Sequence, residues 1–131
     1  MTSLATEGKT STSSTTINEW DDSELIRTNI LRGIYAFGFE KPSPIQKKGI
    51  IPMLTVHDDG KRRDIIAQAQ SGTGKTGCFS VGVLNIVNPD VKETQALILA
   101  PTHELAAQIN NVISDIGRFD QIVVQLLVGG T

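Results

Sequence analysis

The segment AQSGTGKT, from Ala69 to Thr76, combines the residue types that a phosphate-binding loop needs. Gly72 and Gly74 allow the backbone to turn so that consecutive N–H groups point at one phosphate, and a following helix adds its positive end. Lys75 can reach the β- and γ-phosphates, and the Thr76 hydroxyl can ligate Mg²⁺. Ala69 stands where the general pattern has its first glycine. A simple glycine-rich turn is the alternative, but Lys and Thr in register favour a nucleoside triphosphate.

Hydrophobic patterning predicts the elements that position this loop. Short apolar runs at residues 64–67, 96–100 and 122–128 are typical of buried strands, and a helix is expected at residues 75–87. Another helix begins after Pro101 and carries an apolar stripe at helical spacing. The stripe consists of Leu105, Ile109, Val112, Ile113 and Ile116. This alternation predicts an α/β fold, a parallel sheet with helices on both faces.

Two more helices are expected before the phosphate loop. The first begins at a polar cap among residues 21–23, carries isoleucines at every fourth position and ends at Gly38. The second begins at Pro44, which suits the first turn of a helix, and ends near Pro52. Residues 55–63, TVHDDGKRR, are predicted to form an exposed polar loop.

Residues 1–18 differ in composition from the rest of the chain. Ten of them are Ser or Thr, so this segment cannot bury enough apolar surface to offset the entropy of ordering it. We expect a disordered tail there, followed by one partial domain at residues 19–131. A transit peptide is the alternative, but the segment has no Arg and no amphipathic period.

Charge and cysteine content exclude several classes of protein. The 12 basic and 14 acidic residues give a net charge of −2, so any contact with nucleic acid must come from local geometry. The single cysteine, Cys78, cannot form an internal disulfide and is expected to be a small core residue. No apolar run approaches the roughly 20 residues of a membrane span, so we expect a soluble, cytoplasmic protein, with the nucleus as the second compartment.

Three further segments add to the phosphate loop. GFEKPSPIQ runs from Gly38 to Gln46, PTHELAAQ begins at Pro101, and Gly129 and Gly130 follow the third apolar run. With the alanine that opens the phosphate loop, they resemble in order and spacing the Q motif, motif I, motif Ia and GG motif of the DEAD-box family of ATP-dependent RNA helicases. The details look closest to the branch of that family that acts in translation initiation.

The resemblance implies an incomplete RecA-like domain of the P-loop NTPase class, with ATP and Mg²⁺ as cofactors. It implies that Lys75 and Thr76 are the catalytic residues of this segment and that Thr76 ligates Mg²⁺ when ATP is bound. The residues that it implies in ATP binding are Trp20, Phe39, Gln46, Ala69, Gln70, Ser71, Gly72, Thr73, Gly74, Lys75 and Thr76. Those that it implies in RNA binding are Pro101, Thr102, Glu104, Gly129 and Gly130.

Two residues are candidates for reading the base. The Gln46 amide both donates and accepts, so it can pair with the N6 amino group and N7 of adenine together, whereas guanine presents O6 in place of the amino group. The family has a stacking aromatic about seventeen residues before its G-F pair, and Trp20 lies close to that position. Trp20 is therefore a candidate for stacking, and burial in the core is the equal alternative.

The RNA contacts are expected at a helix start and at a turn. At Pro101 and Thr102, free N–H groups and a hydroxyl suit a phosphate. By resemblance, motif Ia and the glycine pair contact the sugar-phosphate backbone, so RNA binding should be independent of sequence. A simple strand-end turn is the alternative for the glycines. His103 departs from the Arg that the family usually has, replacing a fixed cation by a side chain that is mostly neutral at pH 7.

Further family motifs are expected beyond Thr131, including the D-E-A-D motif that holds Mg²⁺ and a second RecA-like domain. We therefore expect this segment to bind nucleotide but not to hydrolyse it or unwind RNA. RNA and translation factors or other proteins are the expected partners, and neither DNA nor a membrane is expected. The alternatives are a non-catalytic fragment that binds RNA or a protein, and another P-loop NTPase such as a small kinase.

Overall fold

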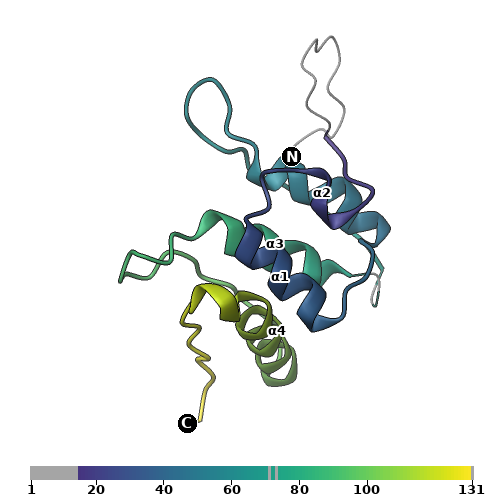
Figure 1. Cartoon of the computed structure of the whole chain (residues 1–131). Helices are drawn as coiled ribbons and strands as arrows, with labels where there is room; N and C mark the ends of the chain where they lie inside the picture. Colours follow the sequence, from purple (N-terminus) through teal and green to yellow (C-terminus); the bar gives the residue numbers. More distant parts are fainter. Residues whose placement is uncertain (1–14, 71, 73, 131) are drawn as a thin grey trace.

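A computed structural model of the chain describes residues 15–70, 72 and 74–130. Its elements are η1 (Trp20–Asp22), α1 (Thr28–Phe37), α2 (Pro44–Leu54), α3 (Lys75–Ile86), α4 (His103–Ile116) and η2 (Gly117–Asp120), where η marks a short 3-10 helix. α3 packs against α2 and α4, and α1 lies across α3 and α4 (Figure 1). No helix in these ranges is long and apolar enough to cross a membrane.

The helices expected from the sequence are present, but the predicted start of the first one is wrong. α1 begins at Thr28 with Arg27 as its N-cap, and the predicted cap region at residues 21–23 lies in and just after η1 instead. α1 ends at Gly38, whose φ of 104° is the left-handed cap conformation that favours glycine. α3 ends at Ile86, just before the predicted Asn-Pro-Asp break. α4 begins after the Thr102 cap and buries three isoleucines of its apolar stripe. Helical periodicity therefore identified the packed faces correctly.

α2 is longer than the sequence suggests. It continues through Pro52 to Leu54, so the prediction that it ends near Pro52 is wrong. The N–H and the hydroxyl of Thr55 both donate to the carbonyl of Ile51, at 3.0 and 2.7 Å. These two bonds close the last turn, and the burial of Ile51 and Leu54 holds it against the core although proline supplies no N–H.

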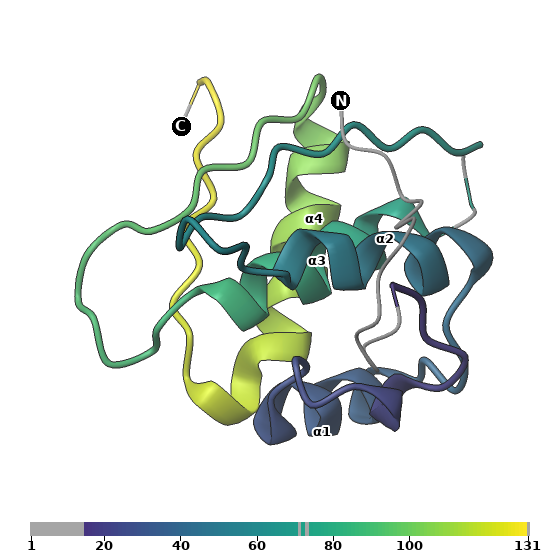
Figure 2. The same ribbon diagram turned by 90° about the horizontal axis from the view of Figure 1, so that it is seen from above.

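The three predicted strands are wrong for the described residues. Residues 64–67, 96–100 and 122–128 run as extended chain, and no strand is assigned anywhere in the ranges that the structure covers. A strand exists only through a ladder of hydrogen bonds to a neighbour. Two of these segments run along the same side of the helices (Figure 2), yet no such ladder forms. The parallel sheet is therefore not formed in the part of the chain that the structure describes.

Alternate residues of the last two segments face opposite ways. Ile98 and Val124 pack against the core. Leu97, Leu99 and Val123 are 77%, 85% and 91% exposed. Alternation with period two is the geometry of a sheet layer covered on one side. The prediction of helices on both faces is accordingly wrong for these residues, because the described chain covers only one face.

We expect this exposed apolar face to make the chain self-associate, since extended backbone beside exposed leucines and valines recruits further chains. Replacing Leu99 and Val123 by glutamine is expected to shift the chain toward monomer in sedimentation velocity. The matched control replaces Tyr35 and Val56, which are 46% and 52% exposed elsewhere, by glutamine. A monodisperse monomer with a sharp thermal transition for the unaltered chain would contradict this prediction.

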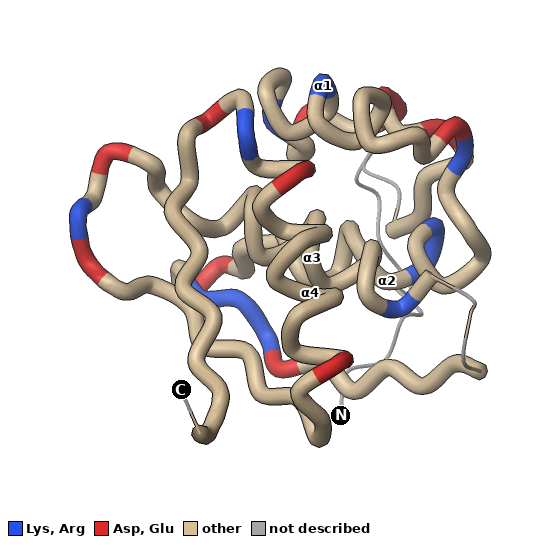
Figure 3. The backbone as a smooth tube through the Cα atoms, turned by 90° about the horizontal axis from the view of Figure 1, so that it is seen from below, with Lys and Arg blue, Asp and Glu red and all other residues tan. Residues whose placement is uncertain are grey.

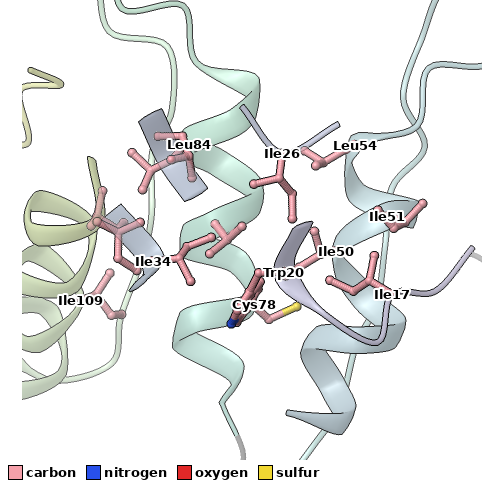
Figure 4. Close-up of a cluster of buried hydrophobic side chains, with 14 residues drawn as sticks. Ile17, Trp20, Ile26, Ile34, Ile50, Ile51, Leu54, Cys78, Leu84 and Ile109 are labelled. Carbon is pink, nitrogen blue, oxygen red and sulfur yellow. The ribbon is translucent and has the colours of Figure 1, made fainter. Parts of the chain in front are cut away.

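The first described residues belong to the packed unit. Ile17 is buried, and its N–H donates to the carbonyl of Lys47 on α2 at 3.1 Å. Ile17 and Trp20 extend into the hydrophobic cluster that fills the space between the helices (Figure 4). The predicted tail boundary at residue 18 is therefore too late, because Ile17 is a core residue. Residues 1–14, the larger part of the predicted tail, lie outside the described residues.

Cys78 is the core residue that its helical position predicts. Its side chain faces α2, where a Cβ atom added to Gly49 would lie 2.9 Å from Sγ. Burial raises the pKa of the Cys78 thiol to about 11. The thiol is therefore protonated at neutral pH and is not an activated nucleophile.

Candidate nucleotide and RNA site

The phosphate loop turns sharply into α3. Gly72 and Gly74 have φ values of 82° and 99°, which side chains other than glycine rarely adopt. Gly74 is the N-cap of α3, so Lys75 is the first residue of the helix and is exposed, with Thr76 partly buried beside it. Free N–H groups at a helix start, next to a lysine, form a site that suits a phosphate. Ser71 and Thr73, also predicted to bind ATP, lie outside the described residues.

Gln46 joins the segment before α2 to this loop. Its Nε2 donates to the carbonyl of Gly74 at 3.0 Å, and its Oε1 accepts from the N–H of Ser43 at 2.8 Å. Gln46 is only 3% exposed. An amide has two donor hydrogens and two acceptor lone pairs, so one donor and one acceptor remain after these bonds. The remaining pair is what simultaneous contact with adenine N6 and N7 requires.

Close packing of glycines fixes this junction. A Cβ atom on Gly74 would lie 2.5 Å from Oγ of Ser43. On Gly77 it would lie 2.6 Å from Nε2 of Gln46 and 2.9 Å from the ring of Phe39. Phe39 therefore contacts the first turn of α3 through its ring edge. Sequence reasoning singled out Phe39 and Gln46 but missed Gly77, because nothing in the local pattern shows which side chain lies opposite it.

Trp20 lies in the core, which was one of its two predicted positions. Its side chain is fully buried, and its ring is stacked 6.2 Å from that of Phe39. The indole N–H is buried without a hydrogen-bond partner among the described residues. Neither face of the indole is open to a base in this structure, so we do not assign it a stacking role.

The motif Ia residues stand at the beginning of α4. The Thr102 hydroxyl accepts from the N–H of Leu105 at 3.1 Å, which caps the helix and leaves the hydroxyl hydrogen available as a donor. Pro101, His103 and Glu104 are exposed around this cap. The helix start therefore presents N–H groups and one hydroxyl to solvent, as the sequence predicts.

The candidate contacts gather at one edge of the molecule. Gly129 and Gly130 are exposed, and Gly130 has a φ of 81°. Figure 2 shows the carboxyl-terminal end of the chain and the beginning of α4 at the same edge.

The donor set at the loop fits a nucleotide with Mg²⁺ rather than a metal held by protein alone. The described residues contain no group of three or more His, Cys, Asp or Glu that could hold a metal ion. The Thr76 hydroxyl is an oxygen donor next to the phosphate position, which suits a hard cation that keeps several waters and binds through phosphates. ATP would supply the phosphate oxygens that such an ion needs.

Comparison with known proteins places this geometry in a family. The family model described as DEAD/DEAH box helicase matches residues 43–131. The chain is 52% identical over 116 residues to the ATP-dependent RNA helicase eIF4A of Chaetomium globosum, covering 88% of this chain and 28% of that protein. It is 48% identical over 125 residues to eIF4A of Neosartorya fischeri, covering 95% of this chain and 30% of that protein. The chain thus spans less than a third of the relatives that it matches.

Solved structures agree. The structure of S. cerevisiae Dbp5 L327V bound to RNA and ADP BeF3 superposes on this chain with a TM-score of 0.70 and 44% sequence identity. The match covers 81% of this chain and 26% of the Dbp5 chain. The structure of Prp28 of Chaetomium thermophilum bound to ADP superposes with a TM-score of 0.73 and 32% sequence identity. That match covers 88% of this chain and 28% of the Prp28 chain. These neighbours are RecA-like helicase domains. The chain belongs to the DEAD-box family of helicases and is similar, within it, to the ATP-dependent RNA helicase eIF4A.

Proposed function

We propose that this chain is the ATP-binding front part of an ATP-dependent RNA helicase that remodels RNA in translation initiation or related RNA metabolism. The observation that carries the proposal is the 3.0 Å bond from Gln46 to the carbonyl of Gly74. This bond connects the residue suited to reading a base with the loop suited to holding phosphates. The two ends of a nucleotide would therefore meet one connected unit.

The phosphates would lie on the first turn of α3. Backbone N–H groups that follow Gly72 and Gly74 would contact them, Lys75 would neutralise the outer phosphates and Thr76 would complete the coordination of Mg²⁺. The metal, when bound with ATP, supplies charge neutralisation of the phosphate oxygens. The residues of this chain hold and orient the nucleotide.

The base would be read by the free half of the Gln46 amide. Because Gln46 is 3% exposed, a base can reach it only if the surrounding segment moves. The bond to Gly74 couples that movement to the phosphate loop. Base recognition and phosphate binding would therefore occur together, and adenine would be preferred because guanine leaves the acceptor of the amide unpaired.

A titration with fluorescent ATP and GTP tests this proposal. We expect weak binding with ATP preferred over GTP, and we expect Gln46→Ala to remove most of that preference. Losing the hydrogen bonds between the Gln46 amide and adenine is expected to lower the affinity for ATP roughly tenfold. The matched control is Gln125→Ala, which removes an exposed amide from the last extended segment. Equal affinity of the unaltered chain for the two nucleotides would disprove base reading by Gln46.

RNA would bind at the edge that carries the beginning of α4. Support comes from the exposed Thr102 cap, from Gly129 and Gly130 at the same edge, and from a neighbour structure that is bound to RNA. Contacts of this kind involve the sugar-phosphate backbone through residues that include Pro101 and Glu104. We therefore propose RNA binding without sequence preference, in the cytoplasm.

The segment itself would bind nucleotide without hydrolysing it or unwinding RNA. Phosphoryl transfer requires groups that position the attacking water and stabilise the transferred phosphoryl group. Lys75 and Thr76 supply phosphate and metal contacts only. The chain also spans only 28% of its relative from C. globosum, so the activity of the whole protein is proposed for a longer polypeptide.

A further inference from the structure

Two arginines share one aromatic ring where η2 packs against α1. The guanidinium carbon of Arg32, on α1, lies 4.2 Å from the centroid of the Phe119 ring, and that of Arg118 lies 4.9 Å from it. Both arginines are exposed, and Phe119 is partly buried. Each guanidinium is within the range of a cation–π contact, which orients its plane on the ring.

Hydrogen bonds that do not involve the guanidinium groups of Arg32 and Arg118 hold η2 against α1. Asp120 accepts from Arg27 and, at 2.8 Å, from Nδ2 of Asn29, which fixes η2 against α1. Asn29 also donates to the carbonyl of Phe119 at 3.4 Å. These bonds fix the backbone of η2 against α1, and each guanidinium lies on the Phe119 ring, so the two guanidinium groups lose little freedom when they bind a partner.

Arg32 and Arg118 differ from the arginines that form ion pairs. Arg27 pairs with Asp120, and Arg63 pairs with Asp59 at 3.1 Å. Arg32 and Arg118 form no ion pair within the ranges that the structure covers. Their donor groups therefore face solvent in a fixed arrangement, which suits bidentate recognition of carboxylates.

We propose that Arg32, Phe119 and Arg118 form a docking site for an acidic protein segment, in which two carboxylates contact the two guanidinium groups. We name these three residues the arginine pair site. It binds independently of nucleotide, because it lies at the edge formed by α1 and η2, away from the beginnings of α3 and α4 (Figure 2). The proposal therefore does not rest on the proposed function.

The surroundings favour a peptide over RNA. An RNA strand needs a continuous basic track, and Figure 3 shows acidic positions interspersed with basic ones around this end of the molecule. Asp115 is exposed one turn before Arg118 on the chain, and Asp120 lies immediately beyond Phe119. A short segment needs only two carboxylates to engage the two guanidinium groups, so it does not require the continuous basic track that RNA does.

The test measures binding of a fluorescein-labelled hexaglutamate peptide to the full chain by fluorescence polarisation at low salt. Replacing Arg32 and Arg118 by glutamine is expected to weaken binding roughly tenfold, the combined effect of two exposed charge contacts. Replacing both by lysine keeps the charge but loses the stacked fork, so an intermediate loss is expected. Hexaglutamine is expected not to bind.

The matched control replaces Lys48 and Arg62, two exposed basic residues on α2 and in the loop after it, by glutamine. It removes the same charge and is expected to leave hexaglutamate binding within about twofold. An equal loss in this control would show unspecific attraction and overturn the proposal. Unchanged peptide binding in the variant that replaces Arg32 and Arg118 by glutamine would also overturn it. The same holds if that variant loses binding to a uridine-rich RNA but keeps binding to the peptide. Thermal unfolding of each variant establishes that the fold is kept.

Discussion

Replacing Lys75 by alanine is expected to abolish detectable nucleotide binding by the chain. Lys75 is the first residue of α3 and is exposed at the point where the phosphates would lie. A hydrogen bond to a charged group contributes about 1.5–3 kcal/mol, and the lysine faces more than one phosphate oxygen. A site that binds only weakly at the start would therefore lose at least about tenfold in affinity, which fluorescent-nucleotide titration can measure.

The control is Lys92→Ala, which removes an equal charge from the exposed turn after α3 and should leave the titration unchanged. Unaltered affinity in Lys75→Ala would mean that the loop is not a working nucleotide site. The same variant tests the proposed absence of hydrolysis. RNA-stimulated phosphate release that disappears in Lys75→Ala would contradict that proposal, because a contaminating enzyme could not follow the substitution.

Several features that depend on neighbours along the chain were predicted correctly, although the start of α1 and the end of α2 were not. The glycine that ends α1 and the Thr102 that caps α4 occupy local geometries that their residue types favour. The phosphate loop is similar, because the positive φ of Gly72 and Gly74 is a property of one turn. The apolar stripe of α4 likewise follows from helical spacing alone.

Features that depend on distant residues could not be predicted in the same way. Trp20 is buried because Phe39 and Ile17 lie against the same cluster, and no spacing rule distinguishes that from a solvent-facing ring. The bond between Gln46 and Gly74 spans 28 positions. The predicted strands failed for the same reason, since the apolar run at residues 96–100 specifies extended backbone but not a partner for its hydrogen bonds.

Gly33→Ala is expected to destabilise the chain more than the same substitution at any other glycine that the structure describes. A Cβ atom on Gly33 would lie 1.8 Å from the carbonyl oxygen of Ile116 and 2.7 Å from its carbon. Both are backbone atoms at the last turn of α4, so relief requires α1 and α4 to separate. Overpacking of this kind costs about 1–3 kcal/mol and sometimes more, whereas the higher helix propensity of alanine contributes at most about 1 kcal/mol. The cost of the clash therefore exceeds the gain in helix propensity, so the substitution lowers the free energy of unfolding.

Urea unfolding followed by circular dichroism measures this effect. With a stability of about 5–15 kcal/mol for typical domains, a loss of roughly 3 kcal/mol would move the midpoint strongly or leave the chain unfolded. The control is Gly129→Ala, because nothing lies within 4 Å of a Cβ atom there. That substitution should leave the midpoint unchanged or raise it slightly, since it lowers the entropy of the unfolded chain. An unchanged midpoint in Gly33→Ala would show that α1 does not meet the end of α4 as closely in solution as it does in this structure.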